Sequence, residues 1–221
     1  GFSDEKTELV LGFSPYFNHH GWLSNMISYD TLVTGMKYLT MARHGHAYMG
    51  VGRNMAYRKQ TFFDHNGFQG LLNERAGDDD LFVNKITTRN NTAVVCSKDS
   101  LTWSAPKRTW REWVQQKRRH LSVSSHYNLG NKLRVGVEPL MRGLMYGMII
   151  VCIVHGGLCA YAALILWALR LTAQLIAVNI CAKRWGMQGF GLNIILHDIF
   201  LPLMTLYILL TKQFYKQKIY W

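Results

Sequence analysis

The C-terminal third of the chain contains a stretch of 39 residues, Leu144–Ala182, in which Arg170 is the one formally charged side chain. As a single helix this stretch would be about 58 Å long, whereas the hydrocarbon core of a bilayer is about 30 Å thick. The pair Gly156-Gly157 divides it, and adjacent glycines favour a turn. We therefore expect a membrane hairpin with arms at about 140–155 and 158–182. Buried helices of a soluble bundle are the alternative, and the near absence of charge argues against them.

A third apolar segment, Phe190–Thr211, follows the hairpin, and Pro202 near its centre is expected to kink it or make it re-entrant. Twelve of the 13 acidic residues lie at or before Glu138, and only Asp198 follows. Basic residues that flank membrane helices favour the cytoplasmic side. Here they are Lys132, Arg134, Arg142, Lys183 and Arg184. We predict a multi-pass protein of the cytoplasmic (inner) membrane whose soluble part faces the cytoplasm.

Residues 1–139 have the pattern of a soluble region that mixes helices and strands. Runs of apolar and β-branched residues predict strands, and apolar residues three to four apart predict helices. The predicted strands are Glu8–Phe13, Asn54–Tyr57 and Thr92–Cys96, and the predicted helices are Ser24–Arg43, Asp78–Thr88 and Thr109–Ser122. The expected fold class is α/β followed by α-helical membrane segments. We divide the chain into an α/β part at 1–104, a basic helix and linker at 105–139, and a membrane region at 140–221.

The predicted helix Thr109–Ser122 combines tryptophan with a concentration of basic residues. Trp110, Trp113 and Val114 share one face, and Arg111, Lys117, Arg118 and Arg119 occupy the rest. This pattern is typical of a helix at a membrane interface or of one that binds a phosphate-bearing ligand. A solvated helix packed by two tryptophans is the structural alternative. A basic patch with aromatic residues also raises nucleic acid as a partner, but the patch lies close to the hydrophobic hairpin, and no helix-turn-helix, RNP-like or zinc-knuckle pattern supports this alternative. We expect no nucleic-acid partner.

Three adjacent carboxylates, Asp78, Asp79 and Asp80, follow Gly77. Like charges this close repel one another unless a cation, a helix N-terminus or a proton-transfer role compensates. One interpretation is a helix start in which Asp78 is the N-cap and the next two acids favour the helix dipole. The other is a catalytic cluster, for which the basic helix downstream would supply countercharge to an anionic ligand.

The order GDDDLFVNKI, SAPKRTWREWVQQKRRHLS and then apolar helices resembles the C-terminal half of membrane-bound family 2 glycosyltransferases, the group that includes hyaluronan, chitin and cellulose synthases. The resemblance implies part of a GT-A type α/β domain, an interfacial amphipathic helix and a helical membrane region. It also implies that Asp78-Asp79 is the family's catalytic acid pair, with Asp79 as the base. Gln115 and Arg118 match the Gln-x-x-Arg-Trp motif that contacts the donor diphosphate, and Arg119 stands at the motif's tryptophan position.

The segment Gly50–Arg58 resembles the family's glycine-rich stretch beside the acceptor site. By this resemblance Gly52, Arg53 and Asn54 lie on the acceptor side, together with His120. Glycine lets the backbone approach a sugar closely. No metal ligand is assigned within this chain.

The resemblance implies an inverting transfer of a sugar from a nucleoside diphosphate donor to a lipid or polysaccharide acceptor at the membrane, assisted by Mg²⁺ or Mn²⁺. In the family a DxD motif in a donor half holds that metal. No Asp-x-Asp occurs before Asp78, so we expect this chain to be the C-terminal part of a longer enzyme and to be inactive alone. A catalytically inactive, membrane-anchored accessory or scaffold protein is the alternative.

Overall fold

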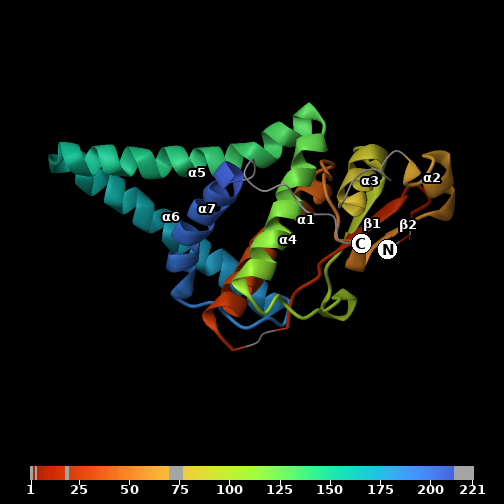
Figure 1. Cartoon of the computed structure of the whole chain (residues 1–221), viewed down its shortest axis with the longest axis horizontal. Coiled ribbons are helices and arrows are strands. Elements are labelled where there is room, and N and C mark those ends of the chain that lie inside the picture. The colour runs from red at the N-terminus through yellow and green to blue at the C-terminus, as the bar shows by residue number, and fades with distance from the viewer. Residues whose placement is uncertain (1, 3, 18–19, 70–76, 212–221) are drawn as a thin grey trace.

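The computed structural model describes residues 2, 4–17, 20–69 and 77–211 (Figure 1). Within them the chain is mostly helical, with one small mixed sheet. The strands are β1 (Leu9–Gly12), β2 (Met55–Tyr57) and β3 (Thr92–Val95), and the α-helices are α1 (Trp22–Arg43), α2 (Lys59–Asp64), α3 (Asp78–Ile86), α4 (Trp110–Val123), α5 (Leu129–His155), α6 (Gly157–Arg184) and α7 (Asn193–Thr211). Short 3-10 helices are η1 (Gly52–Asn54), η3 (Lys98–Ser100) and η4 (Ser124–His126).

The sheet has the order β2-β1-β3, with β1 antiparallel to β2 and parallel to β3. Strand β1 is central because it is the most apolar: Leu9 and Leu11 are fully buried. Each strand predicted from the sequence is present, within a residue or two at its ends. The expected α/β character is confirmed only in this limited form, since helices far outweigh the three short strands.

Helix α1 is packed on several sides, between the sheet and the apolar helices (Figure 1). Its Tyr29 ring lies 5.2 Å from His197 and 5.6 Å from Phe190, measured between ring centroids. A second link joins the two regions, because the Trp185 ring stacks on Phe13 at 4.1 Å and its Nε1 donates to the Cys96 carbonyl at 3.1 Å. The apolar helices are therefore docked onto the sheet side by specific contacts.

The predicted hairpin is present as α5 and α6, with its turn at Gly156-Gly157, and it projects away from the sheet (Figure 1). Helix α5 begins earlier than predicted, at Leu129, because the Asn128 side chain caps it and accepts from the Asn131 N–H at 2.8 Å. Helix α7 continues through Pro202 without a break in the helix.

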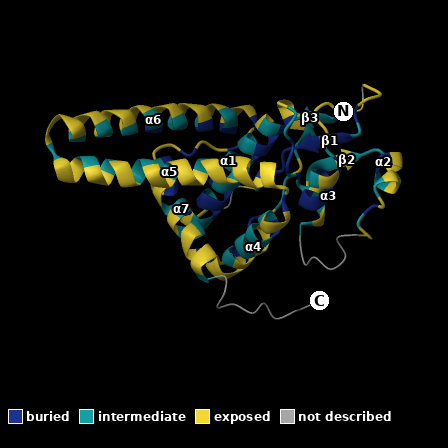
Figure 2. Ribbon diagram, turned by 90° about the horizontal axis from the view of Figure 1, so that it is seen from above, coloured by how far each residue is buried: buried dark blue, intermediate teal, exposed yellow. Residues whose placement is uncertain are grey.

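In the described part of the chain, three helices, α5, α6 and α7, are long and apolar enough to cross a membrane. Figure 2 shows that much of the surface of α5 and α6 is exposed, and large apolar side chains at the hairpin tip, Val154 and Leu158, are more than 80% exposed. Such a surface is stable against lipid rather than water. The three helices indicate membrane association.

Asp198, the one acid after Glu138, lies fully buried in α7. Its carboxylate accepts two hydrogen bonds from the Arg170 guanidinium, at 2.5 and 3.0 Å, and a third from Gln174 Nε2 at 3.0 Å. From α5, Arg142 Nη1 donates at 3.3 Å and the Tyr146 hydroxyl at 2.5 Å. One carboxylate therefore joins all three apolar helices.

We predict that Asp198→Asn destabilises the protein by about 3 kcal/mol, because it removes the carboxylate that pairs with the half-buried Arg170, whereas Arg142 keeps its ion pair with Glu138. The measurement is thermal unfolding of the protein in lipid nanodiscs. The matched control is Asp99→Asn, since Asp99 is exposed. Equal unfolding midpoints for the two variants would contradict the prediction.

Candidate functional site

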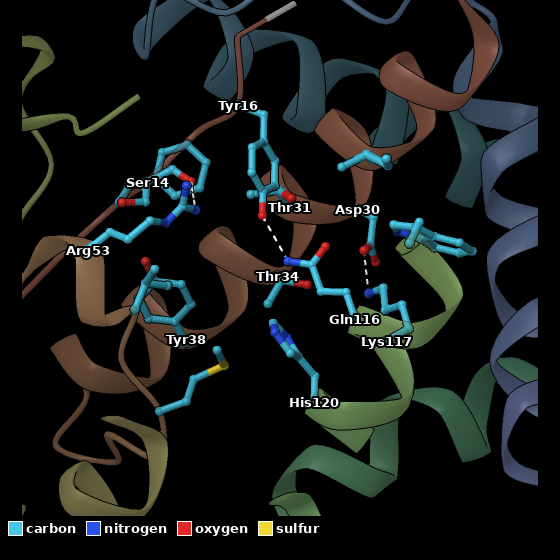
Figure 3. Close-up of a pocket in the computed structure, with 15 residues that line it drawn as sticks. Ser14, Tyr16, Asp30, Thr31, Thr34, Tyr38, Arg53, Gln116, Lys117 and His120 are labelled. Carbon is cyan, nitrogen blue, oxygen red and sulfur yellow. Dashed lines mark hydrogen bonds and ion pairs between the residues drawn. The ribbon is translucent and has the colours of Figure 1, made fainter. Parts of the chain in front are cut away.

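A cavity of about 110 Å³ lies between α1, α4 and the segments around β1 and η1 (Figure 3). Its polar lining comes from separate parts of the chain and includes Tyr16, Asp30, Arg53, Gln116, Lys117 and His120. Three of these side chains bear or can bear positive charge, and one bears negative charge. The cavity therefore offers a polar ligand both charged and neutral hydrogen-bonding groups.

Helix α4 contributes one face to this cavity. The helix begins at Trp110 because Thr109 and Glu112 form a reciprocal capping box. The residues that face the cavity follow the helical period, namely Trp113, Gln116, Lys117 and His120. Gln116 Nε2 donates to the Tyr16 hydroxyl at 3.1 Å, and Lys117 forms an ion pair with Asp30 of α1 (Figure 3).

The α4 residues singled out from the sequence lie on different sides of the helix. Gln115 and His120 are both exposed, and of the two only His120 lines the cavity. Arg118 extends toward α7, where its Nη2 donates to Thr211 Oγ1 at 3.3 Å, and Arg119 is exposed. The sequence analysis missed Gln116 and Lys117. Trp113 is a buried residue of this helix, and counting three and four residues onward from it would have found both.

The pKa of His120 is lowered, chiefly because the cavity walls reduce its hydration and also because Lys117 lies close. The charges of Asp79 and Asp30 act in the opposite direction. The imidazole is therefore mainly neutral at pH 7 and can accept a hydrogen bond.

The three acids form the first turn of α3. The helix is preceded by Gly77, whose φ of 86° is in the left-handed region, and in the described chain no side chain caps this end. Asp78 is thus the first helical residue and not the cap. The partial positive charge of the helix N-terminus offsets part of the repulsion among the carboxylates.

Asp79 lies against the glycine-rich segment. Its Oδ2 accepts from the Gly52 backbone N–H at 2.8 Å, and its Oδ1 accepts from the Asp80 N–H at 2.9 Å. A Cβ on Gly52 would lie only 3.2 Å from Oδ2, so a small residue is favoured there. Gly52 lies between Val51 and Arg53, which line the cavity, so the Asp79 carboxylate is adjacent to the lining residues although it does not itself line the cavity. The structure thus brings together Gly52 and Asp79.

Asp80 lies in the same turn but is buried. Its Oδ2 accepts from the Tyr127 hydroxyl at 3.1 Å and its Oδ1 from the Gly50 N–H at 3.3 Å. Burial first, and the neighbouring Asp79 charge second, raise the pKa of Asp80 to about 7. The sequence pattern does not separate Asp80 from its neighbours, because only the fold decides which carboxylate faces the interior.

The other two acceptor-side candidates of the glycine-rich segment, Arg53 and Asn54, differ in their contacts. The Arg53 guanidinium lies over the Tyr16 ring, 4.9 Å from its centroid, at the cavity wall. The Asn54 Nδ2 donates to the carbonyls of Phe13 and Ser100, at 2.6 and 2.8 Å. Asn54 therefore ties the end of β1 to the segment after β3, next to the cavity.

In residues 2, 4–17, 20–69 and 77–211, no three His, Cys, Asp or Glu side chains are grouped as metal ligands. Asp79 and Asp80 instead accept hydrogen bonds from the backbone, and Asp80 also accepts one from Tyr127. These residues do not fit a divalent metal by themselves.

Comparison with protein families decides the class of the chain. The family described as Glycosyl transferase family group 2 matches residues 6–213, which is nearly the whole sequence. The chain belongs to this family. No curated protein matches it. In this family 2 glycosyltransferase the match includes the sheet, the cavity and the three apolar helices, and the membership of glycosyltransferase family 2 that the sequence motifs indicated is confirmed.

We predict that Asp80 makes the stability of this glycosyltransferase depend on pH. Because the pKa rises from 3.8 in the unfolded chain to about 7 in the folded one, the folded state binds the proton more tightly. The contribution to the free energy of unfolding is full below about pH 4 and is lost as the pH rises to about 7. Asp80→Asn should remove this dependence, worth on the order of 4 kcal/mol.

The measurement is urea unfolding between pH 4 and 8. Asp78→Asn is the control, because Asp78 belongs to the same turn but is exposed. Parallel pH profiles for the wild type and Asp80→Asn would refute the assignment.

Proposed function

We propose that the chain carries the catalytic and acceptor part of an inverting glycosyltransferase, which transfers a sugar from a nucleoside diphosphate donor to a lipid or polysaccharide acceptor. Membership of family 2 supports a glycosyltransferase that uses a nucleotide sugar and an acceptor. The observation that supports the proposal most is the placement of the Asp79 carboxylate on Gly52, beside a cavity lined by the basic helix α4.

In this proposal Asp79 is the general base. Each of its oxygens accepts one backbone hydrogen bond, and a carboxylate oxygen has capacity for a further donor. The acceptor hydroxyl would give its proton to Asp79 while its oxygen bonds to the anomeric carbon, and the bond from that carbon to the diphosphate oxygen would break on the opposite face. Such base assistance is typically worth about 10²–10⁴-fold in rate.

The departing diphosphate gains negative charge, which hydrogen-bond donors and cations stabilise. The family motif implies this role for Gln115, Arg118 and Arg119, whereas we assign it to Gln116, because of these four side chains only Gln116 lines the cavity. On the acceptor side we place Gly52, Arg53, Asn54 and His120. Lys117 forms an ion pair with Asp30 of α1. This pair holds α4 against α1, so part of the Lys117 charge is already used and is not free for the diphosphate.

We propose that Mg²⁺ or Mn²⁺ accompanies the donor diphosphate, since hard cations prefer oxygen ligands. The ligands would lie mainly in a donor half with a DxD motif, and the present chain would then be the C-terminal part of the enzyme. We assign no step to the metal within the described residues, because they do not provide a set of ligands.

We further propose that the enzyme lies in the cytoplasmic membrane with the cavity facing the cytoplasm. The start of α5 and the end of α6 both lie on the side of the sheet (Figure 1). The basic residues expected to stay in the cytoplasm, such as Lys132 and Lys183, are at these ends. An inactive scaffold is not favoured, because the glycosyltransferase family matches nearly the whole chain.

Asp79→Asn in the natural full-length protein should abolish sugar transfer and leave binding of the nucleotide sugar within about threefold of wild type, because the amide cannot accept the proton. Transfer of radiolabelled sugar to the membrane fraction and equilibrium binding of the donor are the two measurements. Asp99→Asn serves as the control. Loss of both activities together would count against Asp79 as the base.

A matched pair tests which face of α4 contacts the substrates. Gln116→Leu should lower kcat/KM by about tenfold or more, whereas Gln115→Leu should change it by less than about threefold, because only Gln116 lines the cavity. Steady-state transfer kinetics of the two variants provide the comparison. A larger effect at Gln115 would show that the exposed face of α4 binds the substrates.

A further inference from the structure

A second cavity, of about 210 Å³, lies beside the first, where α1, the segment after β1, the segment near Trp103 and the connection between α6 and α7 meet. Tyr16 lines both cavities. The other side chains used below are Asn25, Ser28, Trp103 and Phe190. None of these four was singled out by the family motifs.

The aromatic wall of this cavity is held in place by backbone pairing. Tyr16 and Ser104 form a parallel β-bridge. The Phe17 N–H donates to the Ser104 carbonyl at 2.8 Å, and the Ser104 N–H donates to the Pro15 carbonyl at 3.2 Å. The Trp103 ring also stacks on Phe17, with centroids 5.7 Å apart. Tyr16 and Trp103 are thus presented to the cavity from two paired segments.

The polar wall contains a hydroxyl that lacks a partner. Ser28 of α1 is only 4% exposed, and its Oγ makes no hydrogen bond within the described residues. A buried polar atom without a partner is costly, and in a cavity it points to a ligand or a water that satisfies it. Nearby Asn25 is oriented by a 2.7 Å hydrogen bond between its Oδ1 and His197 Nε2.

The size and the mixed walls restrict the ligand. A cavity of about 150 Å³ holds a benzene ring, so this one has room for a single substituted six-membered ring and not for a nucleotide. An acyl chain would leave the Ser28 hydroxyl unsatisfied. A pyranose presents C–H groups to an aromatic face and hydroxyls to polar groups, and it matches both walls.

We propose that this second cavity is a subsite for one sugar ring of the acceptor. The inference rests on the proposed glycosyltransferase function and specifies the chemistry of its acceptor. Tyr16 separates the sugar subsite from the first cavity, and its hydroxyl is held by Gln116. An acceptor sugar in the second cavity would thus lie next to the cavity beside Asp79.

The test is saturation-transfer NMR of the natural full-length protein in lipid nanodiscs, with the methyl glycosides of glucose, galactose, mannose and N-acetylglucosamine as probes. At least one glycoside should bind. Ser28→Leu, which fills the cavity, and Trp103→Ala, which removes a half-buried wall, should each weaken its binding by about tenfold. The matched controls Ser125→Leu and Phe63→Ala alter exposed residues and should bind as the wild type does.

Absence of binding by every glycoside, or equal binding by the wild type and both cavity variants, would overturn the proposal and leave water as the occupant. Transfer assays separate this result from the proposed function. Trp103→Ala should raise the KM for the acceptor, whereas the matched control Phe63→Ala should not. If a glycoside binds but no sugar is transferred from any donor, the proposed enzyme activity is refuted. If sugar is transferred and the KM for the acceptor is the same in Trp103→Ala as in the wild type, the sugar subsite is refuted.

Discussion

Helix α1 is the element on which the rest of the structure depends, because three consecutive residues serve three neighbours. Ser28 faces the second cavity, Tyr29 faces the apolar helices, and Asp30 pairs with Lys117 at the first cavity. Since successive helical residues point about 100° apart, one turn of α1 contacts all three regions. The Tyr29 hydroxyl accepts from Gln174, which also donates to Asp198. The hydrogen-bond cluster around Asp198, which joins the three apolar helices, therefore extends through Gln174 to α1, the helix that lines both cavities.

The acids of α3 illustrate how the fold assigns different properties to identical side chains. Asp79 accepts two backbone N–H groups and stays partly accessible, whereas Asp80 is buried against Tyr127 and holds its proton to about pH 7. Adjacent helical positions diverge in direction, so one carboxylate faces the glycine-rich segment and the next faces the core. This division lets one acid serve as the proposed base while its neighbour is buried in the core.

Local sequence signals predicted the elements well. The uncharged stretch predicted the hairpin, and β-branched and apolar runs predicted the strands. Such local signals do not predict contacts between residues that are far apart in the sequence. The hydrogen bond between Gln116 and Tyr16 joins residues that are 100 positions apart. The family motif indicated Gln115, but a motif does not show which face of α4 is buried. Asn128 as the cap of α5 was missed because the apolar pattern begins only later, and the second cavity depends on segments that no motif connects.

The central claim is that the glycine-rich segment and the cavity face of α4 form one substrate site. Hydrogen–deuterium exchange of the natural full-length protein, with and without saturating uridine or guanosine diphosphate, tests it most directly. With the diphosphate that binds, exchange should slow in peptides covering residues 50–54 and 110–120 together, and remain unchanged at the hairpin tip near Gly156. Protection confined to other described segments, or protection of only one of the two peptides, would contradict the account.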